Sequence, residues 1–354
     1  MIITKQIALL LVCSIFIFSC KPVEVSQSPA ETEGPVCEWP CTEADKLTAS
    51  AMFATTAPEQ TSIAPITGGP SLANCPMFPV NNIWNARVAS LPTHPLSDSW
   101  IDSIGRHEAF HMDFGSATWD GGPIGIPFNI VSGSTVNKYT PDFYYPDESD
   151  PGPYPIPVDP LIEYGSDHHI LVLDTDTCTL YEIYDASFDA GDWSGGSGAI
   201  WNLTSNALRP ETWTSADAAG LPILPGLVRY DEIMAGEIKH ALRFTVENTA
   251  GYIWPARHLT ADPQEDVPPM GARFRLKAEY DISIFPQELH VILQALKTYG
   301  IILADNGSNW YVSGVPDERW DNDMLHLLDV LTGNDFEAVD TSVLMVDVHS
   351  GETK

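Results

Sequence analysis

The stretch His169-Ile-Leu-Val-Leu-Asp-Thr-Asp-Thr-Cys-Thr-Leu-Tyr-Glu-Ile-Tyr184 decides the fold class of this chain. An apolar run ending at Leu173 is followed by the turn residues Asp174-Thr175-Asp176 and by a second run rich in β-branched and aromatic residues. Short runs of this composition on either side of a polar turn predict two neighbouring strands. The stretch therefore places β-structure in the middle of the chain.

The same pattern extends outward over residues 82–274. Gly, Pro, Asn or Asp interrupts the apolar and aromatic runs about every eight to twelve residues, a spacing typical of antiparallel sandwiches and jelly rolls. Further runs of this kind are Ile124–Val131, Ala241–Glu247, Tyr252–Pro255 and Ala272–Leu276. We therefore predict one mainly β, antiparallel sandwich or jelly-roll-like domain over residues 71–349, with α+β as the alternative class.

A few packed helices are predicted near the C-terminus. The first begins at Pro286 and ends before Gly300, because apolar residues share one helical face, namely Leu289, Ile292, Leu293 and Leu296. A second helix is capped by Asp321 or Asn322 and ends before Gly333.

Between these helices the sequence predicts a β-hairpin. Ile301–Asp305 and Asn309–Val312 are strand-like runs, and Asn306-Gly307 between them is a pair that type I′ turns favour. We expect the two strands to pair directly with each other. Asp305, directly before Asn306-Gly307, is either a turn-forming residue or a catalytic carboxyl.

The N-terminus has the features of an export signal. An apolar run from Ile7 to Phe18, too short to span a bilayer, ends just before Cys20. Residues 17–20 resemble a bacterial lipobox, which implies lipidation of the cysteine after cleavage. We expect residues 1–19 to be a signal peptide and residues 20–70, rich in Ser, Thr, Pro and Glu, to be a flexible tether. The protein would then be lipid-anchored at the bacterial envelope, in the outer membrane or at the cell surface, with simple secretion as the alternative.

Four of the six cysteines follow Cys20 in the chain, namely Cys37, Cys41, Cys75 and Cys178. An even number in an oxidising compartment suggests two disulfides. We favour a local Cys37–Cys41 loop and a long-range Cys75–Cys178 bond, although the sequence leaves three pairings open.

The chain is strongly acidic, with 48 Asp and Glu against 17 Lys and Arg and a formal net charge of −31. This charge argues against nucleic acid as a partner, because the phosphate backbone would be repelled. We expect a monomer that contacts a membrane only through its lipid. Six of the nine arginines lie within residues 209–275, where they either pair with carboxylates or form a site for an anionic ligand.

His107-Glu-Ala-Phe-His111 matches the H-E-x-x-H pattern of helical zinc sites, in which two imidazoles one turn apart bind the metal and the Glu activates water. Gly105 and Gly115 bracket the motif closely, and a third ligand could only be guessed, with Glu148 as one candidate. We therefore keep a zinc metallopeptidase as an alternative and expect no resident metal otherwise.

A loop rich in Pro and Tyr carries the carboxylates Asp142, Asp147, Glu148 and Asp150. These residues could hold a structural Ca²⁺ ion, but they lack EF-hand spacing, so a solvated loop is the default interpretation.

The segment from Leu208 to His258 is the densest in reactive side chains. Within it, polar and apolar residues alternate from Gly236 to Phe244, which places His240 on the same side of a strand as its apolar neighbours. A buried histidine with satisfied hydrogen bonds and a catalytic histidine are equally compatible with this pattern.

Three motifs in this part of the chain resemble an uncharacterised family of secreted bacterial proteins. They are Gly236-x-Ile238-x-His240-Ala241-Leu242, Trp254-Pro255-Ala256-Arg257-His258, and Ala295-Leu296-x-x-Tyr299-Gly300 followed by Asp305. The resemblance spans about Cys75 to Asp340 and implies one coherent domain, without implying an activity.

Carboxylates among aromatic residues favour a carbohydrate-active enzyme, most simply a glycoside hydrolase. Such an enzyme needs a protonated carboxyl as general acid and an ionised one as base or nucleophile, with aromatic rings stacked on the sugar. We expect Asp231 or Glu232 to lie opposite Asp305, with His240 beside them. The expected polysaccharide-binding residues are Tyr230, Trp213, Trp254, Arg243, Arg257, His258 and Asp113.

Two other functions use the same residues differently. A polysaccharide lyase acting on uronates would use the arginines and histidines to neutralise the substrate carboxylate. A non-catalytic glycan-binding or envelope protein would need the aromatic residues alone.

Overall fold

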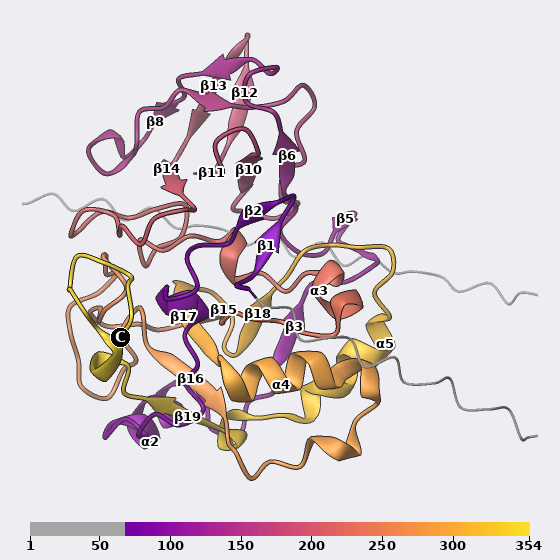
Figure 1. Ribbon diagram of the computed structural model, residues 1–354, viewed down its shortest axis with the longest axis vertical. Coiled ribbons are helices and arrows are strands. Elements are labelled where there is room, and N and C mark those ends of the chain that lie inside the picture. The colour runs from indigo at the N-terminus through magenta and orange to yellow at the C-terminus, as the bar shows by residue number, and fades with distance from the viewer. Residues whose placement is uncertain (1–67) are drawn as a thin grey trace, which may run out of the picture. The chain divides into compact units, whose positions relative to one another are not determined.

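The computed structural model describes residues 68–354, which fall within one compact unit, Pro65–Lys354 (Figure 1). The predicted signal peptide, most of the tether, the lipidation site Cys20 and the proposed Cys37–Cys41 bond lie outside the described residues. Among the described residues, no helix is both long and apolar enough to cross a bilayer.

A four-stranded sheet contains the stretch that opened the sequence analysis, and Figure 1 shows it at the top of the view. Its strands, in sheet order, are β14 (Ser197–Asn202), β11 (Thr179–Tyr184), β10 (Ile170–Asp174) and β6 (Asn129–Val131). β10 and β11 pair antiparallel around the predicted turn, from Ile170 opposite Ile183 to Asp174 opposite Thr179. The predicted pair of neighbouring strands is therefore confirmed.

A six-stranded sheet forms the centre of the larger part of the structure. Its strands, in sheet order, are β19 (Phe336–Val339), β16 (Arg273–Leu276), β17 (Ile301–Asn306), β15 (Leu242–Val246), β18 (Tyr311–Ser313) and β3 (His111–Asp113). Both large sheets are mixed, since β10–β6, β15–β17 and β18–β3 pair in parallel where the spacing had suggested antiparallel strands. The mainly β class with a few helices is confirmed.

The remaining strands form small ribbons. They are β1 (Ser71–Leu72) with β2 (Cys75–Pro76), β4 (Thr118–Trp119) with β5 (Gly122–Pro123), β7 (Lys138–Tyr139) with β9 (Tyr154–Pro155), and the sheet of β12 (Ser187–Asp189), β13 (Asp192–Gly195) and β8 (Asp142–Phe143). A disulfide joins Cys75 to Cys178. This bond confirms the long-range pairing and ties the β1–β2 ribbon to the turn that follows β10.

The α-helices are α2 (Ser97–Ile104), α3 (Tyr230–Ala235), α4 (His290–Thr298) and α5 (Asn322–Leu325). α4 and the short 3-10 turn before it (Gln287–Leu289) cover the predicted 286–299 segment, and Gly300 ends the helix with φ +66°. α5 is capped by Asp321 as expected and continues as a 3-10 helix, His326–Val330. α2 was not anticipated.

The predicted hairpin of Ile301–Asp305 with Asn309–Val312 is wrong. β17 and β18 do form, but β15 lies between them, parallel to β17 and antiparallel to β18. The five residues of β15 are all buried, so this strand gains more apolar contact at the centre of the sheet than at an edge.

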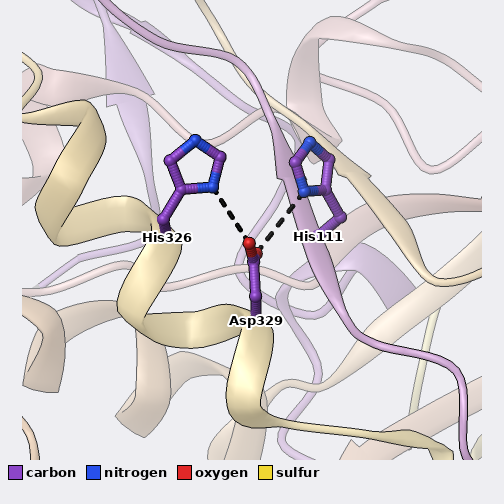
Figure 2. Close-up of side chains that lie close together, drawn as sticks. All are labelled: His111, His326 and Asp329. Atoms are coloured by element: carbon purple, nitrogen blue, oxygen red, sulfur yellow. Dashed lines mark hydrogen bonds and ion pairs between the residues drawn. The ribbon is translucent and has the colours of Figure 1, made fainter.

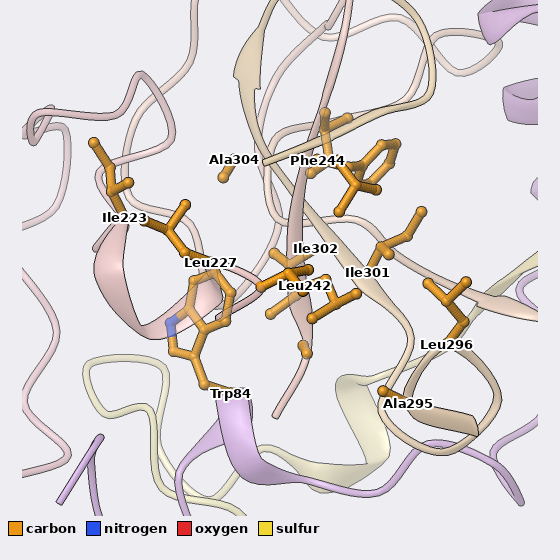
Figure 3. Close-up of a cluster of buried hydrophobic side chains, with 14 of the residues drawn as sticks. Trp84, Ile223, Leu227, Leu242, Phe244, Ala295, Leu296, Ile301, Ile302 and Ala304 are labelled. Carbon is orange, nitrogen blue, oxygen red and sulfur yellow. The ribbon is translucent and has the colours of Figure 1, made fainter. Parts of the chain in front are cut away.

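Apolar side chains from segments far apart in sequence form the core beside this sheet (Figure 3). Figure 3 shows Leu242 of β15, Ile302 of β17, Leu296 of α4 and Trp84 gathered around the sheet. On the opposite side of β15 from Arg243, Phe244 packs against Trp310 and Phe274, with ring centroids 5.9 and 5.5 Å away. This packing sets which side chains of β15 face outward.

Candidate functional site

Polar side chains from four adjacent strands lie on one face of the six-stranded sheet. Thr245 of β15 is in register with Asp305 of β17 on one side and with Tyr311 of β18 on the other. Tyr311 is in turn in register with His111 of β3. Side chains in register point to the same face of a sheet. Because Phe244 packs on the apolar face of β15, the neighbouring Thr245 and the residues in register with it lie on the opposite, polar face of the sheet.

Arg243 lies at the centre of this polar face and is buried. Its guanidinium donates two hydrogen bonds to Asp217, from Nε to Oδ2 at 2.7 Å and from Nη2 to Oδ1 at 2.5 Å. It also donates to Ser313 Oγ at 2.5 Å and to Asp305 Oδ2 at 3.4 Å. One arginine therefore holds two carboxyl groups close together at the end of the sheet.

Asp305 is the carboxyl whose protonation differs most from an ordinary aspartate. Burial raises its pKa well above the usual value, and the negative charge of Asp217, together with their hydrogen bond, raises it further, although Arg243 opposes the shift. Two carboxyls this close do not both ionise readily. Burial and the neighbouring Asp217 carboxylate therefore favour the protonated form of Asp305, while 19% of its side-chain surface remains exposed.

A second ion pair, Glu163 with His169, supports the loop that carries Asp217. His169 Nδ1 lies 2.5 Å from Glu163 Oε2, and its Nε2 lies 3.0 Å from the carbonyl of Ala216. Burial alone would lower the pKa of His169, but the Glu163 carboxylate raises it to about 9. The imidazole is thus a cation that donates from both nitrogens, and it fixes the residue before Asp217.

An open cavity of about 450 Å³ lies over Asp305. Most of the residues that line it are polar, and they include Tyr145, Glu148, Asp167, Tyr184, Ser197, Thr214, Asp217, His258, Thr260, Asp305 and Asn306. Glu148 accepts a hydrogen bond from the Thr214 amide at 3.2 Å and lies 3.8 Å from His258 Nε2. The cavity thus combines a carboxyl of raised pKa, the half-buried carboxylates of Glu148 and Asp167, an imidazole and two tyrosines.

Of the residues predicted from sequence, Asp305 and His258 line this cavity and Arg243 supports it. Arg257 does not offer its charge to a ligand, because it donates to the carbonyls of Arg209 and Val348, each at 3.0 Å.

The six arginines of residues 209–275 are all buried and engaged. Four pair with carboxylates: Arg209 with Asp150, Arg229 with Asp231 and Glu232, Arg243 with Asp217 and Asp305, and Arg275 with Glu337. Arg257 and Arg273 bind backbone carbonyls instead. The arginine-rich segment therefore serves the fold and forms no anion site.

Asp231, Glu232 and His240 do not meet Asp305. Glu232 is buried between Arg229 Nη2 and His240 Nε2, both at 3.1 Å, and Asp231 pairs with Arg229 on α3. None of the three lines the cavity over Asp305. This arrangement contradicts the expected pairing across a cleft, because local ion pairs at the start of α3 already neutralise these carboxylates.

The predicted aromatic residues are also dispersed. Tyr230 packs against Trp320, Trp213 lies beside the guanidinium of Arg209, and Trp254 donates from Nε1 to the carbonyl of Ser350. None of Tyr230, Trp213 and Trp254 lines the cavity over Asp305, whose aromatic residues are Tyr145 and Tyr184.

The H-E-x-x-H segment is not a helix. Residues 106–107 form a turn, Ala109 forms an isolated β-bridge with Thr332, and His107 accepts a hydrogen bond from the Asn334 side chain. His111 begins β3 and faces Asp329 and His326 (Figure 2). The premise of two imidazoles one helical turn apart is therefore not met. Asp113, on the same strand, lines a neighbouring cavity together with these three residues.

The acidic loop does not gather its carboxylates around one point. Asp150 is bound to Arg209, and Glu148 faces Thr214 and His258. Among residues 68–354, the only group of three or more His, Cys, Asp or Glu with closely spaced donor atoms is His111, His326 and Asp329.

Sequence reasoning missed Glu163, His169 and Asp217. His169 comes just before the strand-forming run of residues 170–173, and no neighbouring residue indicates that it is charged. Asp217 lies in a loop 88 residues before Asp305, so the sequence does not indicate that the two carboxyl groups meet. Comparison of the chain with protein-family models, curated proteins and solved structures found no match.

Proposed function

We propose that this protein hydrolyses glycosidic bonds in a neutral saccharide, with Asp305 as the general acid. One observation carries the proposal: Asp305, whose pKa burial and the Asp217 carboxylate raise well above the usual value, lines an open cavity that also holds Glu148 and Asp167. Acid-catalysed cleavage of an acetal needs such a pair of protonated and ionised carboxyl groups.

In this proposal Asp305 protonates the leaving oxygen, and Arg243 with Asp217 sets the pKa and the orientation of the acid. Glu148 is the candidate base or nucleophile. Its side chain is 37% exposed, and the Thr214 amide and His258 orient it. Catalytic geometry of this kind depends on supporting groups that are themselves fixed.

The composition of the cavity favours a neutral substrate over a uronate. Beside Asp305, the carboxylates of Glu148, Asp167 and Asp217 line it, and their negative charge would repel an anionic sugar. The nearby Arg243 and Arg257 are already engaged. Hydroxyl and amide groups of Thr214, Thr260 and Asn306 suit hydrogen bonding to sugar hydroxyls, so we favour hydrolysis over lyase chemistry.

The test is release of reducing ends from a panel of neutral polysaccharides, compared with the absorbance of unsaturated lyase products. The decisive variant is Asp305→Asn. Because burial and Asp217 favour the neutral form of Asp305, an amide should replace it with little disturbance to Asp217 and Arg243, while the transferable proton is lost. We expect kcat to fall by about 10²-fold or more, as is typical for loss of a general acid.

The matched control is Asp102→Asn. This residue is an exposed aspartate of α2 that pairs with Arg106, so its replacement should leave kcat unchanged. If no saccharide is cleaved, but Asp305→Asn and the unaltered protein bind a glycan equally, the protein is a glycan-binding module and the hydrolase proposal is wrong. We propose that it acts at the bacterial envelope, held by the lipid on Cys20.

A further inference from the structure

Two histidines and an aspartate converge at the β3 edge of the six-stranded sheet. Figure 2 shows the imidazoles of His111 and His326 on either side of the Asp329 carboxylate, each with a ring nitrogen turned toward it. His111 Nδ1 lies 3.4 Å from Asp329 Oδ1, and His326 Nδ1 lies 2.9 Å from Asp329 Oδ2. The donor atoms of the three residues all lie within 4.8 Å of one another.

Local structure explains why the three side chains meet. His326 and Asp329 are three residues apart in the 3-10 helix His326–Val330, in which side chains at this spacing lie one above the other. His111 comes from the adjacent strand β3, in register with Tyr311, and its ring packs against the Tyr311 ring at 4.4 Å. The two secondary-structure elements therefore hold the donor atoms from opposite sides.

The spacing suits a divalent transition metal. With metal–ligand bonds of about 2.0–2.2 Å, two ligands of a tetrahedral site lie roughly 3.3–3.6 Å apart. The distance between His111 Nδ1 and Asp329 Oδ1 is already 3.4 Å, and that oxygen is buried without a hydrogen-bond donor among residues 68–354. A buried carboxylate oxygen without a donor is unfavourable, and a cation between the rings would satisfy it.

The three donors leave room for a further ligand. They line a cavity of about 350 Å³ together with Asp113, Trp119 and Tyr311. Two histidines and one carboxylate with an open position toward a cavity are the donor set of catalytic zinc sites and of non-haem iron sites. A closed structural zinc site would instead supply four protein ligands.

We propose that His111, His326 and Asp329 bind one divalent transition-metal ion, with Zn²⁺ as the best-suited ion and a coordination position open to the cavity. This site is separate from the cavity over Asp305 and does not depend on the proposed hydrolase activity. It also differs from the H-E-x-x-H prediction, because it uses His111 without His107.

The test is titration of the full chain, without a histidine tag and after removal of metal with a chelator, with Zn²⁺ alone. We expect one equivalent to bind. His326→Ala should weaken binding by at least about 100-fold, since loss of a direct ligand exceeds the roughly 10–100-fold effect of removing a residue that only orients one. His326 is well suited to substitution because 60% of its side chain is exposed. Asp329→Asn should have a similar effect, and Co²⁺ should give a visible absorption band that His326→Ala abolishes.

Two matched controls separate this site from nonspecific binding. His168→Ala alters an exposed histidine paired with a single carboxylate, Asp185, at 3.6 Å, and should leave Zn²⁺ affinity unchanged. His107→Ala should also leave it unchanged. The proposal is overturned if no equivalent binds, if His326→Ala and Asp329→Asn bind as the unaltered chain does, or if His107→Ala loses the ion. Asp305→Asn should retain Zn²⁺ binding, so failure of one proposal is distinguishable from failure of the other.

Discussion

The buried ion pair of Glu163 with His169 predicts a specific dependence of stability on pH. Burial opposes the charge on His169, yet Glu163 raises its pKa from 6.5 to about 9. Between these two pH values the folded protein binds more protons than the unfolded chain. The stabilising contribution is therefore fully present below about pH 6.5 and is lost as the pH rises through about 9.

The magnitude follows from the size of the shift. A pKa difference of about 2.5 units corresponds to about 3 kcal/mol at about 1.4 kcal/mol per unit. The His169 side chain is 2% exposed and that of Glu163 is 18% exposed, so solvent screens this pair only weakly. The desolvation of His169 is already included in this value, because the pKa of about 9 is the balance between burial, which lowers it, and the Glu163 carboxylate, which raises it.

The assay is urea unfolding at pH 6 and pH 10 for the unaltered protein and for Glu163→Gln. Between pH 6 and pH 10, the free energy of unfolding of the unaltered protein should fall by up to about 3 kcal/mol more than that of the variant. The reason is that His169 in the variant has no carboxylate beside it to stabilise its protonated form. His168→Gln, in which the neighbouring exposed histidine is changed, should behave as the unaltered protein does. Equal losses in the unaltered protein and in Glu163→Gln would refute a charged His169.

Two further outcomes concern the scaffold. Replacing both Cys75 and Cys178 with Ala should lower the free energy of unfolding by about 4–5 kcal/mol, because the disulfide closes a loop with a sequence separation of 103 residues. A denaturant midpoint equal to that of the disulfide-bonded protein would contradict this. Gly300→Ala should lower the free energy of unfolding by more than about 1 kcal/mol in thermal unfolding, because Gly300 has φ +66° and an added Cβ would collide with the carbonyl of Phe274. The control is Glu288→Gln, which alters an exposed residue in the 3-10 turn before α4 and should leave thermal unfolding unchanged.

The candidate site shows how a few local contacts changed the interpretation of the sequence. Asp231, Glu232 and Asp305 looked equivalent as carboxylates near aromatic residues. In the structure, Glu232 of α3 is bound by Arg229 and His240, whereas Asp305 shares Arg243 with Asp217 and its pKa is raised by burial and by the Asp217 carboxylate. Their different environments, and not their residue type, separate a structural carboxylate from a candidate acid.

The sequence by itself determined the features that depend on neighbouring residues. The β10–β11 pair follows from two apolar runs around a short polar turn, and α4 follows from apolar spacing that ends at Gly300. The mainly β class and the Cys75–Cys178 bond were also predicted correctly. For the strand pair and the helix, short-range spacing is sufficient, because the contacts are made within one turn or between two neighbouring strands. For the disulfide, the small number of cysteines limits the possible pairings.

Only the tertiary structure decided which distant segments meet. β15 separates β17 from β18 although Asn306-Gly307 favours a direct turn, because burial of all of β15 at the centre of the sheet outweighs the local turn preference. The same strand order aligns Asp305, Thr245, Tyr311 and His111 across one face. Such convergence depends on sheet order and register, which are set by packing between segments far apart in the chain and leave no local pattern in the sequence.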